Sequence, residues 1–264
     1  MAIIYCNGYF ASLDKPYCPD SDYGVYTTIL LEDAKVYFLE EHLRRLSMHA
    51  KKLTLEKTIN KNELLQLIEK NKAMKGKWRI RVMITAKMVL ATIQKEENLQ
   101  ADKISLCTYQ KPWISANSQL KTLATFNRLK LLKHANEKGF SDCITFDENK
   151  NILETSIANI FWIKDNMFYY PDSKLNYLKG ITLSFAIDVA RKMGLIVQSG
   201  AYKLSQLEDA DVFYCNSMKK VLPVIRVENV KYLKNSVTQI EFIHHFCSMA
   251  KAHSTCFALK TQKS

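Results

Sequence analysis

Asn151-Ile-Leu-Glu-Thr-Ser-Ile-Ala-Asn-Ile-Phe-Trp162 is the stretch that decides how the rest of this chain is interpreted. It lies between two apolar, β-like runs, residues 142–147 and 160–163, and a polar turn, residues 148–151, leads into it. One carboxylate, Glu154, therefore enters a segment whose other residues are apolar or small, where an unpaired charge is costly. Glu154 is either a strand-edge residue facing water or a carboxylate held beneath a cationic ligand.

The composition is that of an ordinary soluble globule, with 264 residues, 47% of them hydrophobic and 24% charged. This length suits two modest domains or one large one. The N-terminus lacks the basic and long apolar regions of a signal peptide, and no apolar run approaches a membrane span. Seven cysteines without a Cys-x-x-Cys pair argue against a disulfide framework or a zinc cluster. We therefore expect a cytoplasmic protein with reduced thiols and no metal.

The formal net charge is +12, but the lysines are spread over the whole chain. This pattern favours a solvated basic face, with some attraction for anionic small molecules, over a nucleic-acid surface. We expect a small-molecule substrate and neither a nucleic-acid nor a membrane partner.

Helical and β-like segments alternate along the chain, which predicts an α+β fold. Helical spacing of apolar residues covers 40–53, 60–71, 126–138, 183–193 and 239–252. Asn7-Gly8 predicts a tight hairpin near the start. Residues 112–119 are polar and without periodicity, so they are predicted to link an N-terminal α/β domain, residues 1–111, to a C-terminal α/β domain, residues 120–264.

Several common site motifs are absent. With seven glycines in the chain, neither a Gly-x-Gly-x-x-Gly fingerprint nor a Walker loop is present, and there is no Gly-x-Ser-x-Gly elbow. His244 and His245 are adjacent on a predicted helix and do not face each other, so they are expected at a surface rather than on a metal.

Six short motifs, in this order and spacing, together resemble the fold-type IV pyridoxal-phosphate enzymes, the class IV aminotransferase family. They are Gly24-Val-Tyr-Thr-Thr28, His42-Leu-Arg-Arg-Leu46, Asn127-Arg-Leu129, Glu154 to Trp162, Gly180-Ile-Thr182 and Cys215-Asn-Ser with Pro223-Val224. The resemblance covers nearly the whole chain. It implies the two-domain fold of D-amino-acid aminotransferase, a cofactor cleft between the domains, pyridoxal phosphate as cofactor, and a homodimer.

The resemblance also assigns cofactor-binding roles. Arg45, Ile181, Thr182 and Ser217 stand where the family binds the cofactor phosphate. A guanidinium fork suits a phosphate dianion, and the amides of a helix N-terminus favour an anion. Glu154 matches the glutamate facing the pyridine nitrogen, where a carboxylate keeps that nitrogen protonated.

Within the family, the sequence favours 4-amino-4-deoxychorismate lyase, which forms 4-aminobenzoate and pyruvate for folate synthesis. The aminotransferases usually carry a glutamate where this chain has the first threonine of the pair Thr27 and Thr28, and a hydroxyl there could help move a proton. The pair could equally be two threonines suited to a strand. The alternatives are a branched-chain or D-amino-acid aminotransferase, or a catalytically inactive homologue that binds a ligand.

The chain departs from the family at two places. The lysine that links covalently to the cofactor should stand three residues before Asn127, but Ala124 occupies that position and has no amine. This reflects an engineered change, a natural lysine-free homologue, or a local shift that lets Lys121 serve; Lys130 lies inside the following helix. Thr85-Ala-Lys87 also stands where relatives often have an Arg-Gly turn that binds a substrate carboxylate.

Overall fold

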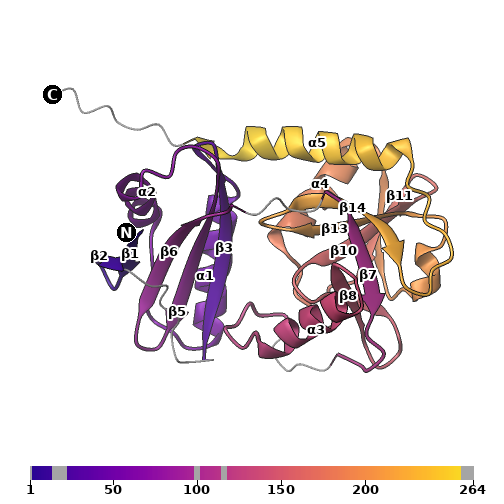
Figure 1. Cartoon of the computed structure of the whole chain (residues 1–264), viewed down its shortest axis with the longest axis horizontal. Coiled ribbons are helices and arrows are strands. Elements are labelled where there is room, and N and C mark those ends of the chain that lie inside the picture. The colour runs from indigo at the N-terminus through magenta and orange to yellow at the C-terminus, as the bar shows by residue number, and fades with distance from the viewer. Residues whose placement is uncertain (1, 14–22, 98–101, 114–117, 257–264) are drawn as a thin grey trace. The chain divides into compact units, whose positions relative to one another are not determined.

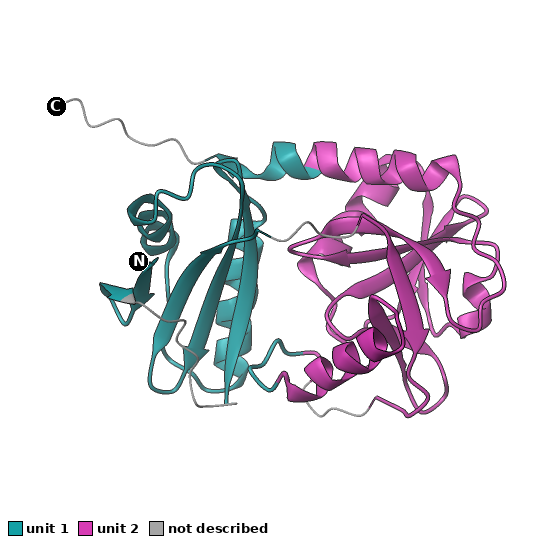
Figure 2. Ribbon diagram, viewed as in Figure 1, with its two compact units in different colours: residues 1–99, 120–124, 250–264 teal, residues 100–119, 125–249 magenta. Residues whose placement is uncertain are grey.

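The computed structural model describes residues 2–13, 23–97, 102–113 and 118–256 of the chain. Figure 2 shows the two compact units into which the chain divides. The first unit contains residues 1–99, 120–124 and 250–264, and the second contains residues 100–119 and 125–249.

The first unit is an antiparallel sheet with two helices. Its seven strands lie in the order β15-β4-β3-β5-β6-β1-β2. Their bounds are β1 (Ala2–Cys6), β2 (Tyr9–Leu13), β3 (Gly24–Glu32), β4 (Lys35–Val36), β5 (Lys77–Thr85), β6 (Val89–Lys95) and β15 (Thr255–Cys256). Helices α1 (Leu39–Lys52) and α2 (Lys61–Lys70) share one apolar core with this sheet (Figure 1).

Local signals explain several of these elements. Asn7 and Gly8 both have positive φ and join β1 to β2, as the hairpin signal predicted. Helix α2 starts at a capping box in which the side chain of Asn60 accepts from the amide of Glu63 and Glu63 accepts from the amide of Asn60.

The second unit is built on one mixed sheet of eight strands in the order β12-β11-β10-β13-β14-β7-β8-β9. The strands are β7 (Ile104–Thr108), β8 (Asp142–Phe146), β9 (Ile152–Thr155), β10 (Asn159–Lys164), β11 (Met167–Pro171), β12 (Ile196–Gly200), β13 (Asp211–Asn216) and β14 (Lys220–Val227). Its helices are α3 (Phe126–Glu137), α4 (Ile181–Lys192), the short 3₁₀ helix η1 (Leu204–Leu207) and α5 (Val237–His253), whose residues from 250 onward belong to the first unit.

The helices predicted from apolar spacing are all present within a few residues of their expected ends, and the α+β class is confirmed. The division into units differs from the linker expected at residues 112–119, part of which, 114–117, lies outside the described residues. Strand β7 pairs in parallel with β8 and β14 and so belongs to the second unit. Residues 120–124 instead belong to the first unit, where Thr122 forms a bridge with Val25 of β3. Apolar spacing identifies a strand but not the strand it pairs with. The expected domain boundary at residues 112–119 therefore differs from the division that the structure shows.

An aromatic cluster fixes the core of the second unit. The ring of Phe161 on β10 stacks 4.6 Å from that of Phe168 and 4.7 Å from that of Phe213. Phe242 of α5 contacts the same ring at 5.4 Å. Because these side chains are fully buried, strands β10, β11 and β13 and helix α5 depend on one another for packing.

The substitution Phe161→Ala should therefore lower the free energy of unfolding by about 3–5 kcal/mol, because it leaves a cavity among three rings. Phe126→Ala removes the same atoms from a side chain that is 65% exposed, and should change stability by about 0.5 kcal/mol or less. Denaturant unfolding of both variants measures the difference. Equal losses would contradict the role given to this cluster.

Candidate functional site

Thr27, His42 and Arg45 form a polar cluster in the first unit, in which Thr27 and His42 are buried and Arg45 is half-buried. The Thr27 hydroxyl lies 2.6 Å from Nδ1 of His42, and a guanidinium nitrogen of Arg45 donates to the same oxygen at 3.0 Å. Thr27 points from β3 toward α1, which carries both partners. Thr27 is therefore a positioning residue for Arg45.

The hydrogen-bond count sets the tautomer of His42. Because Arg45 can only donate, the Thr27 oxygen accepts from it, and the hydroxyl proton is best placed on Nδ1 of His42. The imidazole is then neutral with its proton on Nε2. Burial, followed by the charges of Arg45 and Lys121, lowers the pKa of His42 well below its usual value, which agrees with this neutral form. Its Nε2 is buried without a hydrogen-bond partner among the described residues.

Arg45 carries a shielded positive charge. Burial lowers the pKa of its guanidinium to about 10, so it remains a cation at neutral pH. Its Nε is also buried without an acceptor, and within the described part of the chain no ion pair involves Arg45. The cluster therefore offers a positive charge and two nitrogen atoms without acceptors, which are groups that bind an anion.

The other two candidates of the first unit lie elsewhere on its surface. Thr28 points to the opposite face of β3 from Thr27, is half-buried, and pairs in register with Arg81 of β5. Ala124 is exposed, just after the residues that pair with β3.

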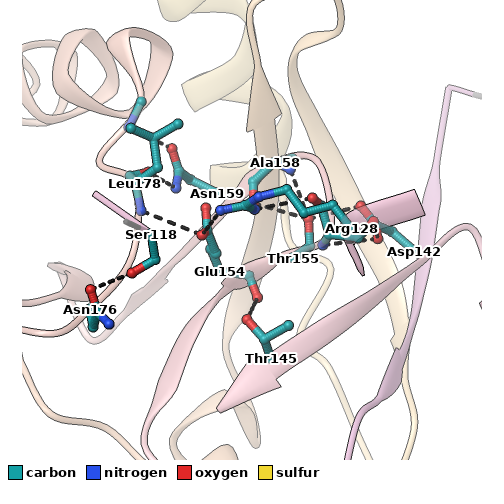
Figure 3. A network of polar contacts seen from close by, with 12 residues as sticks. Ser118, Arg128, Asp142, Thr145, Glu154, Thr155, Ala158, Asn159, Asn176 and Leu178 are labelled. Carbon is teal, nitrogen blue, oxygen red and sulfur yellow. Dashed lines mark hydrogen bonds and ion pairs between the residues drawn. The ribbon is translucent and has the colours of Figure 1, made fainter. Parts of the chain in front are cut away.

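Glu154 in the second unit is 3% exposed and is paired, so the alternative of a water-facing glutamate is excluded. Its Oε1 lies 2.7 Å from a guanidinium nitrogen of Arg128 on α3, and also accepts from the amide of Leu178 at 3.4 Å (Figure 3). The second arm of Arg128 donates to the carbonyl of Ser156 at 3.2 Å. The motif Asn127-Arg-Leu129 marked this position, but spacing along the chain did not reveal that Arg128 reaches Glu154.

Asn159 clamps the loop that enters helix α4 (Figure 3). Its amide nitrogen donates to the carbonyl of Leu178 at 2.8 Å, and its oxygen accepts from the amide of Gly180 at 2.8 Å. A Cβ on Gly180 would collide with that oxygen. Asn159 thus holds the loop, and Gly180 is needed for the close approach.

The clamp sets the N-terminus of α4, which begins at Ile181 directly after Gly180. The first amides of a helix have no intrahelical acceptor. The hydroxyl of Thr182 is buried and has no hydrogen-bond partner among the described residues. Together these groups are donors without acceptors, which suits an anion such as a phosphate.

Ser217 lies half-buried in the turn between β13 and β14. Asn216 shapes this turn, because its side-chain oxygen accepts from the amides of Met218 and Lys219 at 3.1 and 2.8 Å. Its amide nitrogen also donates to the carbonyl of Ile157 at 3.4 Å, which ties the turn to the segment that carries Glu154.

Asp142 is a buried carboxylate that the sequence did not single out. It accepts from the hydroxyls of Thr155 at 2.8 Å, Tyr214 at 3.1 Å and Ser156, and from the amides of Cys143 and Ser156. It therefore fixes the turn that follows Glu154. The only available signal was an acidic residue at the start of an apolar strand.

In the second unit, hydrogen bonds join the loop before α4 and the turn that carries Ser217 to the segment of residues 154–159, while Thr27 and Arg45 meet in the first unit. That both groups serve one cofactor stays a prediction. No cluster of three or more metal-ligating side chains occurs within the described residues, and none of the helices described there is long and apolar enough to span a membrane.

The family model for class IV amino-transferases matches residues 24–227. The chain belongs to this family. This class IV family member is 27% identical in sequence to the aminodeoxychorismate lyase of Bacillus subtilis, and the match covers 87% of this chain and 88% of that protein. It is 30% identical to a probable branched-chain-amino-acid aminotransferase of Rickettsia bellii, over 67% and 68% of the two chains.

Solved structures of the family share the fold. A T.th. branched-chain amino acid aminotransferase, solved with pyridoxamine 5′-phosphate, superposes with a TM-score of 0.84 at 19% identity, covering 96% of this chain and 95% of that one. A putative 4-amino-4-deoxychorismate lyase of Legionella pneumophila gives a TM-score of 0.79 at 22% identity, covering 90% and 96%. The predicted family resemblance is confirmed.

Removing the partner of Glu154 should be costly. Arg128→Met leaves a buried carboxylate unpaired and should destabilise the protein by about 3 kcal/mol. Arg191→Met breaks an exposed pair with Asp188 and should cost less than about 1 kcal/mol. The double variant Arg128→Met with Glu154→Gln should recover part of the loss in denaturant unfolding. Additive losses would show that the two residues do not interact.

The buried histidines should make stability fall in mild acid. Burial, then the charges of Arg45, Lys52 and Lys121, lowers the pKa of His49 to about 4, so the folded state resists a proton that the unfolded chain accepts near pH 6.5. Stability is therefore complete above pH 6.5 and decreases as the pH falls toward 4.

The substitution His49→Asn keeps a hydrogen-bond acceptor but removes this proton. When the pH falls from 6 to 5, the free energy of unfolding of this variant should decrease by about 1 kcal/mol less than that of the unmodified protein. The exposed His245, changed to Asn, should leave the pH dependence unaltered. Denaturant midpoints across this pH range measure the effect, and identical slopes for all three proteins would refute it.

Proposed function

We propose that this protein is a pyridoxal-phosphate-dependent lyase that converts 4-amino-4-deoxychorismate into 4-aminobenzoate and pyruvate. The observation that carries the proposal is the set of unsatisfied donors around Arg45 and Thr182, together with the buried carboxylate of Glu154. The likeness to the B. subtilis aminodeoxychorismate lyase over most of both chains supports the reaction.

The residues present fit the cofactor. Its phosphate dianion suits the guanidinium of Arg45 and the N-terminus of α4, where Ile181 and Thr182 offer amides and a hydroxyl, with Ser217 as a further donor. Its pyridine nitrogen suits Glu154, a carboxylate kept from water. Among the positions expected to contact the cofactor, Ala124 lacks the amine that the family uses.

When bound, pyridoxal phosphate supplies an electron sink for the carbon that bears the substrate amine. Glu154 holds the ring nitrogen in its protonated form, and Arg128 holds Glu154 in place. Because the Thr27 oxygen is occupied by Arg45 and His42, we assign the proposed proton transfer to Thr28. Loss of pyruvate leaves an aromatic ring, which favours the forward reaction.

An aminotransferase is the second candidate. The 30% identity to the Rickettsia enzyme and the fold of the branched-chain aminotransferases favour it. Thr27 weighs against it, since those enzymes usually have a glutamate there. A third candidate, from a different class, is a ligand-binding protein without catalysis, which the missing lysine at Ala124 favours.

The proposed activity places the protein in folate synthesis in the cytoplasm, acting on a small molecule as a homodimer. These assignments rest on the family resemblance.

Incubation with aminodeoxychorismate and pyridoxal phosphate should release pyruvate, while exchange between amino acids and 2-oxo acids should be slow. Arg45→Gln should weaken cofactor affinity by about tenfold or more, because a charge-assisted phosphate contact is lost. Arg44→Gln changes an exposed arginine next to it and should leave affinity unchanged.

Efficient amino-group exchange without pyruvate release would favour the aminotransferase. Cofactor binding without either reaction would favour the ligand-binding protein. Equal affinities for the two arginine variants would remove Arg45 from the phosphate site.

A further inference from the structure

Lys121 lies in a segment that the fold holds firmly. The amide of Tyr26 donates to the carbonyl of Lys121 at 2.9 Å, and the amide of Leu123 donates to the carbonyl of Gly24 at 2.9 Å. The amide of Lys121 donates to Nδ1 of His49 at 3.1 Å. Residues 121–123 thus extend the sheet beside β3, and the direction of the Lys121 side chain is set by strand geometry.

The side chain of Lys121 crosses the open face of this sheet. Its Nζ lies 4.6 Å from the ring centroid of Tyr26, and the guanidinium of Arg81 lies 4.6 Å from the same ring. Leu123, two residues on, packs with Met83 and Tyr26 on that face. Ala124 comes after the paired residues, so the strand alternation that would turn Lys121 away from it does not apply.

The Lys121 segment lies against α1, the helix that carries Arg45, because the Lys121 amide donates to Nδ1 of His49, one helical turn beyond Arg45. The charges of Lys121 and Arg45 both lower the pKa values of His42 and His49. His42 in turn shares the Thr27 hydroxyl with Arg45. The Lys121 segment and Arg45, the proposed phosphate anchor, are therefore both joined to β3 and α1 of the first unit.

The positions of Lys121 and Arg45 correspond to two neighbouring groups of the cofactor. In pyridoxal phosphate the aldehyde and the phosphate arm are carried by neighbouring ring carbons. An amine beside the phosphate anchor is therefore at the correct end of the cofactor to meet the aldehyde.

We propose that Lys121 supplies the amine that links this protein covalently to its cofactor, in place of the lysine missing at Ala124; the inference rests on the proposed function. The Lys121 ammonium gives one proton to water. Its nitrogen then bonds to the aldehyde carbon, the carbonyl oxygen leaves as water, and a carbon–nitrogen double bond remains. No electron is gained or lost overall.

Other lysines fit the role less well. Lys130 stacks over the exposed Phe126 at 4.2 Å on α3. Lys219 lies over Tyr214 at 5.5 Å, where Asp142 attracts it. Both belong to the second unit.

The test uses the full chain with stoichiometric pyridoxal phosphate, borohydride reduction, and peptide mapping by mass spectrometry. The unmodified protein should carry one phosphopyridoxyl group on Lys121. Lys121→Arg keeps the charge but cannot form the bond, so the adduct should be lost while cofactor still shifts the melting temperature. Lys130→Arg should keep the adduct.

An adduct on another lysine, or bound cofactor with none on Lys121, overturns the inference. The Ala124→Lys variant then separates two cases. If only that variant is labelled, at the new side chain, the inference fails and the proposed function stands. If neither protein binds cofactor, both fail.

Discussion

Two buried carboxylates organise the second unit. Asp142 gathers three hydroxyls and two amides and so fixes the turn after Glu154, while Glu154 holds Arg128 and the loop that leads into α4. Each carboxylate is costly to remove from water, and that cost is offset only when its partners are fully in place. The position of the α4 N-terminus follows from this requirement.

The local parts of the fold were predictable, because they depend on residues close in sequence. The Asn7-Gly8 hairpin and the helices belong to this class. The pairing of β7 was not, since an apolar strand can join any sheet that buries it. Arg45, Thr182 and Glu154 were predicted as cofactor-binding residues from the order of the family motifs, and no local structural rule would have identified them.

The remaining features of the candidate site arise from contacts across long sequence separations. The Arg128 pair with Glu154 depends on how α3 packs on β8, which periodicity cannot show. Thr27 was expected near the chemistry, and the structure instead places its oxygen between His42 and Arg45. Strand alternation would turn Lys121 away from Ala124 only if both residues lay in one strand, and Ala124 follows the paired residues.

The pairing of β15 with β4 has a consequence for synthesis of the chain. Residues 250–256 belong to the first unit, although they are synthesised only after the whole of the second unit. His253 also bonds to Glu41 at 2.8 Å. Until those residues emerge, β4 is an unpaired strand edge on an otherwise complete sheet, which is the kind of surface that recruits foreign strands. A nascent chain of this protein therefore remains vulnerable to misassembly until the second unit and the residues of β15 have been synthesised.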